Sequence, residues 1–346
     1  MAGQKSENKK MISDILNSDI LLACLVLAPV VMAIIRKKTK TATTTIAIYL
    51  SAFIVGSTIK KATAIPRPFI YQPQILGLSS NIPQDFSFPS LHTMLATIFA
   101  WTLASVAPQL SWLGFGVNMV VALSRVLLGV HYYTDIFFGF IFATLIYWAG
   151  FFLINPGEII KPHSNIKRKL VHFIFGAGLV VLLKYQLITA LQIVPIFLGL
   201  GLVMFFVNHP KFKIFRQAIV HFERSKDPQF PGLGLFWYLL SSLTVLLFFE
   251  KNIALAAIIN LAAGDSINAL TGFFYNRPKQ KLVGPNCAAF FASMLLVMNF
   301  VGPLRALTGV LTASILEFIG PRIKGEKVDD NIWIPIVSAM AMSLVA

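Results

Sequence analysis

Residues 20–35, ILLACLVLAPVVMAII, form an uninterrupted apolar run, and the basic stretch RKKTK follows at residues 36–40. A run of this length can cross the hydrocarbon core of a bilayer as an α-helix, which satisfies its own backbone hydrogen bonds. No small-residue cleavage site follows the run, so we interpret it as a retained span and not as a signal peptide. Similar runs recur along the chain, which predicts an all-α polytopic membrane protein.

Composition supports the same fold class. Hydrophobic residues make up 56% of the 346 residues and charged residues only 12%, whereas a soluble domain carries about 25% charged residues. The formal charge of +15 then indicates cytoplasmic loops and contacts with anionic headgroups, and we expect no nucleic-acid partner. Cys24 and Cys287 lie far apart in apolar context, so they indicate neither a metal site nor a disulfide framework.

The apolar segments predict two transmembrane helical bundles with about 11–12 spans in total. In the first bundle we expect spans near residues 18–35, 44–60, 90–107, 111–129 and 133–154. In the second we expect them near residues 170–184, 187–207, 233–249, 252–272, 286–301, 304–320 and 332–346. The polar stretch NPGEIIKPHSNIKRK separates the two sets. It predicts one bundle over residues 1–155, a basic linker over 156–169 and a second bundle over 170–346.

Polar residues of the first bundle occur in three short motifs. These are KKATAIPRP with Lys60 and Arg67, FPSLHT with Ser90 and His92, and SRVLLGVHYYTD with Ser124, Arg125, His131 and Asp135. In a hairpin topology, the end of the second span, the start of the third and the junction of the fourth and fifth lie on one membrane face. The three motifs can therefore converge on one site.

This set of side chains suits phosphoryl transfer. Three cations can hold the equatorial oxygens of a phosphate: Lys60, Arg67 and Arg125. His131 and Asp135 are four residues apart, so on a helix the carboxylate can orient the imidazole as a nucleophile. His92 remains as a general acid for the leaving oxygen, and Ser90 can donate a hydrogen bond to the phosphate. The alternative is that these are charged residues extending from helix ends toward water.

The three motifs, spread over about residues 40–150, resemble the signature of the type 2 phosphatidic acid phosphatases, a membrane-embedded, metal-independent superfamily of lipid phosphatases. The resemblance implies that His131 forms a phosphohistidine, that Asp135 is its partner and that His92 is the acid. It further implies phosphate binding by Lys60, Arg67, Ser90 and Arg125. Leu91 stands where the family usually has glycine, and a positive φ or close phosphate approach at that position would disfavour leucine.

The second bundle carries a separate polar set. Its members are Arg168, Lys169, His172, Glu223, Asp265, Lys279, Lys281, Asp329, Asp330 and Asn331. A carboxylate inside a span, such as Asp265, is costly and indicates a function. Carboxylates together with a basic loop suit a Mg²⁺–nucleoside triphosphate, although no Walker-type or protein-kinase glycine loop is present. The alternative is that Asp265 pairs with a basic residue and that the basic loops are cytoplasmic anchors.

The stretches RKLVH, ER…FPGLG, GDSINALTG and DDNIWIP resemble, in order, the CTP-dependent polyprenol kinases, a family that includes dolichol kinase, phytol kinase and a yeast-type diacylglycerol kinase. The resemblance covers nearly all of residues 165–340. It implies CTP as phosphoryl donor, a lipid-alcohol substrate and Mg²⁺ held by Asp265. In the basic loop, Gln280 stands at the family's lysine position and Lys281 follows one place later, which leaves a non-catalytic domain as an alternative.

The distribution of basic residues predicts an orientation in the cell membrane. If the N-terminus lies outside, most basic loop residues lie inside, as the positive-inside rule requires. The phosphatase-like motifs then face outward, and the kinase-like motifs face the cytoplasm, where nucleotides are.

Together these observations predict a bifunctional lipid-carrier enzyme. Its phosphatase would remove phosphate from a polyprenyl phosphate or pyrophosphate without a cofactor. Its kinase would phosphorylate a polyprenol or dolichol with CTP. Three alternatives stay open: a phosphatidate phosphatase paired with a diacylglycerol kinase, a phosphatase with a non-catalytic second half, and a lipid or phosphate transporter.

Overall fold

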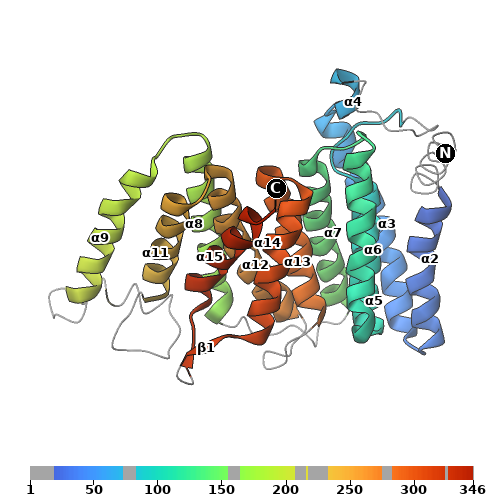
Figure 1. The fold of residues 1–346 in the computed structure, drawn as a ribbon. Coiled ribbons are helices and arrows are strands. Elements are labelled where there is room, and N and C mark those ends of the chain that lie inside the picture. The colour runs from blue at the N-terminus through green and yellow to red at the C-terminus, as the bar shows by residue number, and fades with distance from the viewer. Residues whose placement is uncertain are drawn as a thin grey trace, which may run out of the picture. The chain divides into compact units, whose positions relative to one another are not determined.

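A computed structural model describes residues 19–72, 83–154, 164–206, 216, 233–274, 283–323 and 326–345, and Figure 1 shows its elements. In these ranges the regular structure is helical, apart from a short antiparallel hairpin of β1 (Arg322–Ile323) and β2 (Glu326–Lys327). The chain divides into two compact units, residues 1–159 and 160–346. Each expected span segment contains a helix.

The first unit is built around one helix, α5 (Leu91–Val106). The other elements of this unit are α2 (Asp19–Ile35), α3 (Thr39–Thr63), α4 (Pro68–Tyr71), the 3₁₀ helix η2 (Pro108–Leu110), α6 (Ser111–Leu127) and α7 (Tyr133–Ile154). Helix α5 packs against α2, α3, α6 and α7. A helix that is apolar on all sides belongs in the interior of a bundle. In α5, Trp101 is fully buried, and its indole Nε1 donates to Thr144 Oγ1 at 3.0 Å.

The second unit has α12 (Lys251–Phe274) at its centre. The other helices are α8 (Ser164–Lys184), α9 (Ala190–Phe206), α11 (Leu233–Phe248), α13 (Val283–Val301), α14 (Pro303–Ile319) and α15 (Asp330–Ser343). Helix α12 packs against α8, α11, α13, α14 and α15. Its buried alanines let neighbouring backbones approach closely, as is common between membrane helices. Inside this packing, Asn260 Nδ2 donates to Ser338 Oγ at 2.9 Å.

Five described helical segments are long and apolar enough to cross a membrane: Thr39–Tyr71, Pro108–Leu127, Tyr133–Leu153, Lys251–Gly272 and Gly284–Val301. Shorter apolar helical segments of 10–17 residues are Leu21–Ile35, Leu91–Val106, Ala190–Gly199 and Leu233–Phe248. The predicted fold class is therefore confirmed: the protein is an all-α polytopic membrane protein.

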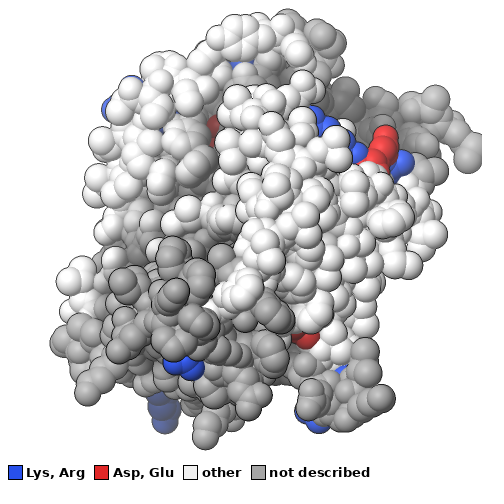
Figure 2. All heavy atoms as spheres, turned by 90° about the vertical axis from the view of Figure 1, so that its left-hand side faces the viewer, with Lys and Arg blue, Asp and Glu red and all other residues white. Residues whose placement is uncertain are grey.

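The surface agrees with this assignment. Figure 2 shows one face on which the described residues are almost all uncharged, while charged side chains gather toward its upper and lower ends. Large apolar side chains of α9 are exposed in the structure, among them Leu191, Ile196, Leu198 and Leu202. An extended exposed apolar surface of this kind needs lipid contact to be stable.

Candidate active site in the first unit

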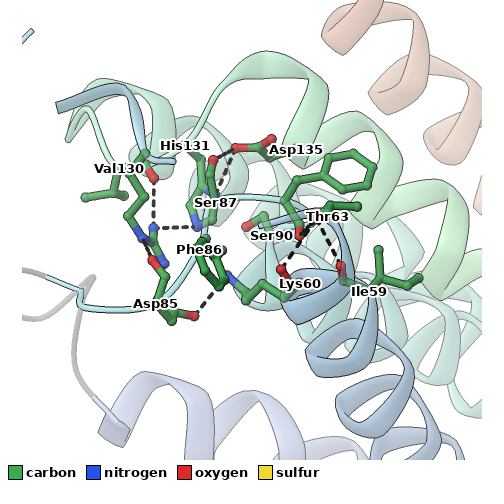
Figure 3. A network of polar contacts seen from close by, with 12 residues as sticks. Ile59, Lys60, Thr63, Asp85, Phe86, Ser87, Ser90, Val130, His131 and Asp135 are labelled. Atoms are coloured by element: carbon green, nitrogen blue, oxygen red, sulfur yellow. Dashed lines mark hydrogen bonds and ion pairs between the residues drawn. The ribbon is translucent and has the colours of Figure 1, made fainter. Parts of the chain in front are cut away.

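The three polar motifs of the first unit meet at one end of the helical bundle (Figure 3). Lys60 lies in the last turn of α3, Arg67 caps the N-terminus of α4, and Ser90 caps α5. Arg125 lies in the last turn of α6, and Asp135 lies in the first turn of α7. The structure thus brings together side chains that are up to 75 residues apart in the sequence, counted from Lys60 to Asp135.

His131 and Asp135 form a buried pair. His131 Nδ1 is 3.2 Å from Asp135 Oδ2, and the two residues are 3% and 1% exposed. An ionised carboxylate only accepts hydrogen bonds, so Nδ1 carries the proton in this contact and Nε2 keeps its lone pair. Burial, together with the charge of Arg67, outweighs the contact with Asp135, which acts in the opposite direction, and lowers the pKa of His131 to about 4. The imidazole is therefore neutral at pH 7, as a nucleophile must be.

Asp135 is itself held by further donors. Its Oδ2 atom accepts from the backbone N–H of Tyr132 at 2.8 Å and from the hydroxyl of Ser87. Its backbone carbonyl accepts from the N–H of Ser90 at 3.1 Å, which ties the start of α7 to the start of α5. Because each of these contacts fixes the carboxylate, the direction of the His131 ring is fixed as well.

Arg67 lies directly beside Nε2, the ring nitrogen of His131 that does not contact Asp135. Its Nη1 atom is 3.2 Å from His131 Nε2 and donates to the carbonyl of Val130 at 2.8 Å. Arg67 is 4% exposed, so its guanidinium is a fixed charge in a site of low dielectric constant. A phosphate that His131 attacks would therefore contact Arg67.

The chain between Lys60 and Arg67 turns sharply so that both cations face the same site. Ala64 ends α3 in the left-handed conformation, with φ 47°, and its N–H bonds to the carbonyl of Lys60. Arg67 is extended, and Pro68 at the first position of α4 needs no backbone donor there. The spacing in KKATAIPRP thus has a geometric reason.

Ser90 is fully buried and caps α5. Its Oγ atom accepts from the N–H of Thr93 at 3.4 Å and from Thr93 Oγ1 at 3.1 Å. In both contacts the Ser90 hydroxyl is the acceptor, so its own hydrogen can still be donated to a phosphate. The predicted phosphate contact is compatible with the capping role.

Arg125 and His131 are joined by a tight loop. The carbonyl of Arg125 accepts from the N–H groups of Val130 at 3.1 Å and His131 at 3.2 Å. Gly129 has φ 69°, a conformation that glycine adopts without strain. The Arg125 side chain is 2% exposed, and its Nε donates to Ser124 Oγ at 3.2 Å.

His92 lies close to this cluster, in the first turn of α5. It interacts electrostatically with Arg125, His131, Arg67 and Lys60. Its Nε2 atom is buried and has no hydrogen-bond partner among the described residues. A buried nitrogen without a partner needs an explanation, and a ligand oxygen in the site would supply one. The role of His92 as general acid stays a prediction.

Two residues of the site were missed in the sequence: Asp85 and Ser87. Asp85 Oδ2 is 3.0 Å from Lys60 Nζ, and its other oxygen accepts from Arg67 Nη2. Burial alone raises the pKa of Asp85, but the hydrogen bonds and charges of Arg67 and Lys60 outweigh it and lower the pKa below its ordinary value. An acidic residue just before FPSLHT was an available signal, since the chain has only 14 acidic residues.

Leu91 occupies the position at which the family usually has glycine. It begins helix α5 and has right-handed helical geometry, so no positive φ is required there. Its side chain points toward α3, where Gly56 makes room for it: a Cβ at Gly56 would be 2.5 Å from Leu91 Cδ2. The absence of a side chain at Gly56 therefore provides the space that Leu91 occupies.

We expect Gly56→Ala to lower the stability of the first unit by less than about 1 kcal/mol, because the added methyl group displaces the flexible ends of Leu91 and Met94 while alanine favours the helix by about 1 kcal/mol over glycine. Thermal unfolding in detergent measures the effect. The same substitution should cost less in a Leu91→Gly background, since the nearest clashing atom is then absent. Additive effects of the two substitutions would contradict this packing relation.

Residues 41–156 match the PAP2 superfamily. These residues form a PAP2 superfamily domain. An undecaprenyl-diphosphatase of Sulfolobus acidocaldarius is 28% identical over 137 residues, which cover 39% of this chain and 66% of that protein. An uncharacterized protein of Methanocaldococcus jannaschii is 27% identical over 183 residues, 52% of this chain and 93% of that protein. No solved structure matches the chain.

In the second unit, outside the PAP2 domain, the structure joins three predicted residues. Lys169 of α8 and Asp265 of α12 form an ion pair, and His172 Nδ1 is 3.6 Å from the same carboxylate oxygen. Ser266 Oγ donates to the carbonyl of Lys169 at 2.8 Å, which strengthens the contact between the two helices. This pairing is the alternative that the sequence left open for Asp265.

The other predicted residues of the second unit have different positions. Asp329 caps α15, Asp330 begins that helix, and Asn331 Nδ2 donates to the carbonyl of Gly234 in α11 at 3.1 Å. Glu223, Lys279, Lys281 and the side chain of Arg168 lie outside the described residues. Among the described residues, no group of three or more His, Cys, Asp and Glu side chains could hold a metal ion.

Proposed function

We propose that the PAP2 domain hydrolyses lipid phosphates or diphosphates, with a polyprenyl diphosphate as its substrate class. The observation that carries this proposal is the buried His131–Asp135 pair with Arg67 beside His131 Nε2. A neutral, oriented imidazole next to a fixed cation is the arrangement that nucleophilic attack on phosphorus needs.

In the proposed mechanism, the substrate phosphate displaces the contact between Arg67 and His131. His131 Nε2 forms a bond to phosphorus as the bond to the leaving oxygen breaks, and His92, which takes up a proton when the negative charge of the substrate phosphate lies beside it, gives that proton to the leaving oxygen. Water then attacks the phosphohistidine, gives its proton to His92 and releases inorganic phosphate. Lys60, Arg67 and Arg125 stabilise the charge on the phosphoryl oxygens in both steps.

An aromatic cluster beside the site supports a lipid substrate. The ring of Phe88 is 5.5 Å from that of Phe138 and 6.1 Å from that of Phe142, between centroids. Phe138 is 40% exposed, so part of this cluster lies on the surface of the helical bundle. The apolar chain of a substrate can lie there while its phosphate reaches Arg67. The polyprenyl assignment also draws on the relative named undecaprenyl-diphosphatase.

Purified protein in detergent tests the proposal. We expect release of inorganic phosphate from polyprenyl diphosphate without added metal. Phosphatidic acid in a parallel assay tests the alternative phosphatidate phosphatase. Release of no phosphate from any lipid phosphate would contradict the proposed function, and uptake of substrate into liposomes without hydrolysis would favour a transporter.

We expect Ser87→Ala to lower kcat by about tenfold, because a hydrogen bond to a charged group contributes about 1.5–3 kcal/mol. Ser87 is a positioning residue that acts through Asp135, so KM should change little. Ser87→Thr keeps the hydroxyl and should recover most of the activity. Equal losses in the alanine and threonine variants would contradict a role for the hydroxyl.

We also propose that the PAP2 site faces the outside of the cell membrane. Arg36, Lys37 and Lys38 form the turn between α2 and α3, at the opposite end of α3 from Lys60. By the positive-inside rule this basic turn belongs in the cytoplasm. Hydrolysis of substrate added to sealed right-side-out vesicles tests the orientation, and activity only after the vesicles are opened would contradict it.

For the second unit, a CTP-dependent lipid-alcohol kinase remains a proposal. It rests on the resemblance of the sequence motifs and on the presence of an ionisable residue, Asp265, within an apolar bundle. The prediction that Asp265 binds Mg²⁺ gains no support from the described residues, because its carboxylate pairs with Lys169. Transfer of label from γ-labelled CTP to polyprenol or diacylglycerol tests the kinase. Equal rates for wild type and Asp265→Ala would reject this site, and absence of transfer would favour a non-catalytic second half.

A further inference from the structure

Residues 85 and 86 contact two cations of the proposed phosphate site, Lys60 and Arg67. The carboxylate of Asp85 contacts Lys60 Nζ at 3.0 Å through Oδ2 and Arg67 Nη2 through Oδ1. The carbonyl of Asp85 accepts from Arg67 Nε at 2.8 Å, and the carbonyl of Phe86 accepts from Lys60 Nζ at 2.5 Å. Figure 3 shows Asp85 and Phe86 in this position beside Lys60.

The carboxylate of Asp85 uses donors that a bound phosphate would need. A carboxylate and a phosphate both accept charge-assisted hydrogen bonds from arginine and lysine, and each offers neighbouring oxygens that can contact two donors at once. Arg67 Nη1 is 3.2 Å from His131 Nε2, so a phosphorus atom within reach of His131 places its oxygens close to the Arg67 guanidinium. Asp85 and a phosphate therefore compete for Arg67 and Lys60.

The two sides of this contact differ in their freedom to move. The side chains of Lys60 and Arg67 are 7% and 4% exposed, whereas that of Asp85 is 52% exposed. Both cations are surrounded by protein, but Asp85 lies in a bend before α5 and can turn its carboxylate into water. Asp85 is therefore the partner that can leave, and water can solvate its charge when it does.

We propose that Asp85 is a displaceable internal anion of the phosphate site, and this inference rests on the proposed function. In the free protein, Asp85 neutralises Lys60 and Arg67 and keeps them in place. When the substrate phosphate binds, it takes over these contacts, and the carboxylate moves into water. When inorganic phosphate leaves, Asp85 returns, so that two buried cations are not left unpaired.

Asp85 would then weaken the affinity of the site for free phosphate and limit inhibition by the product. Asp85→Asn keeps the size of the side chain and removes its charge. We expect this variant to bind inorganic phosphate about tenfold more tightly, an effect below that of a fully buried charge pair because Asp85 is half exposed.

Isothermal titration calorimetry with inorganic phosphate measures the affinity, and the inhibition constant of phosphate during lipid diphosphate hydrolysis measures it independently. Glu250→Gln is the matched control, since it makes the same change in charge in the second unit at a residue that is 74% exposed. This control should leave both constants unchanged. Asp85→Glu retains the charge and should stay close to wild type.

Phosphate affinity that is unchanged or weaker in Asp85→Asn would overturn the proposal. If the variant is less stable, thermal unfolding with and without phosphate still decides, because tighter binding gives a larger stabilisation by saturating phosphate. The proposed function can fail separately. If Asp85→Asn binds phosphate more tightly but the wild type hydrolyses no lipid phosphate, only this inference stands. If the wild type hydrolyses lipid diphosphate but its inhibition constant for phosphate equals that of Asp85→Asn, only the proposed function stands.

Discussion

Replacement of His131 by alanine should reduce phosphate release by about 10⁴-fold or more, because the proposed reaction forms its covalent intermediate on this residue. His131 is 3% exposed, and its Nε2 faces Arg67 inside the site, so we expect the substitution to lower kcat. Phosphate release from polyprenyl diphosphate at saturating substrate measures kcat. Binding of inorganic phosphate should be retained, because Lys60, Arg67 and Arg125 remain.

His131→Asn is the companion variant, since it preserves a polar side chain in the space of the imidazole and guards against collapse of the site. Thermal unfolding shows whether each variant is folded. Substantial activity in a folded His131→Ala protein would reject His131 as nucleophile.

Replacement of Asp135 by asparagine should reduce kcat by about 10³-fold to 10⁴-fold, comparable to the loss of the orienting carboxylate in serine hydrolases. One oxygen of this carboxylate accepts hydrogen bonds from His131 Nδ1, the backbone N–H of Tyr132 and the hydroxyl of Ser87. An amide can present its NH₂ group instead, which favours the wrong tautomer of His131 and directs its lone pair away from phosphorus.

The pH dependence distinguishes this role from general damage. Asp135 raises the pKa of His131 against the larger effect of burial, so the asparagine variant should have a still lower pKa at His131. Any loss of activity on the acid side that is due to protonation of His131 should therefore move to lower pH. A shift toward higher pH, or a kcat within threefold of wild type (about 0.6 kcal/mol), would contradict the assignment.

The fold class was predictable because the bilayer imposes strong rules on sequence. Runs such as residues 20–35 and 133–154 must be helical when they cross lipid, so each expected segment contains a helix. The three phosphatase motifs were recognisable because ionisable residues are rare in such a chain, and their order implied one membrane face. The roles of His131, His92 and Asp135 stay predictions that the variants above test.

The contacts between segments were not predictable in the same way. Asp85 and Ser87 look like ordinary loop residues in the sequence, and their function depends on where the backbone before α5 passes Lys60 and Asp135. Leu91 looked unfavourable in the sequence, but it lies in a right-handed helix, where no positive φ is required, and Gly56 on another helix leaves space for its side chain. Asp265 could have been a metal ligand or an ion-pair partner, and its proximity to Lys169 favours the pair.

The sequence by itself determined the helical membrane fold and the chemical types of residue available for phosphoryl transfer, because both depend on composition and on spacing along the chain. Tertiary structure alone decided that one Asp135 oxygen holds His131, Ser87 and Tyr132, and that Asp85 lies between Lys60 and Arg67. The physical reason is that packing α3, α5, α6 and α7 sets distances between side chains far apart in the sequence. The free energy of a hydrogen bond or an ion pair depends on those distances.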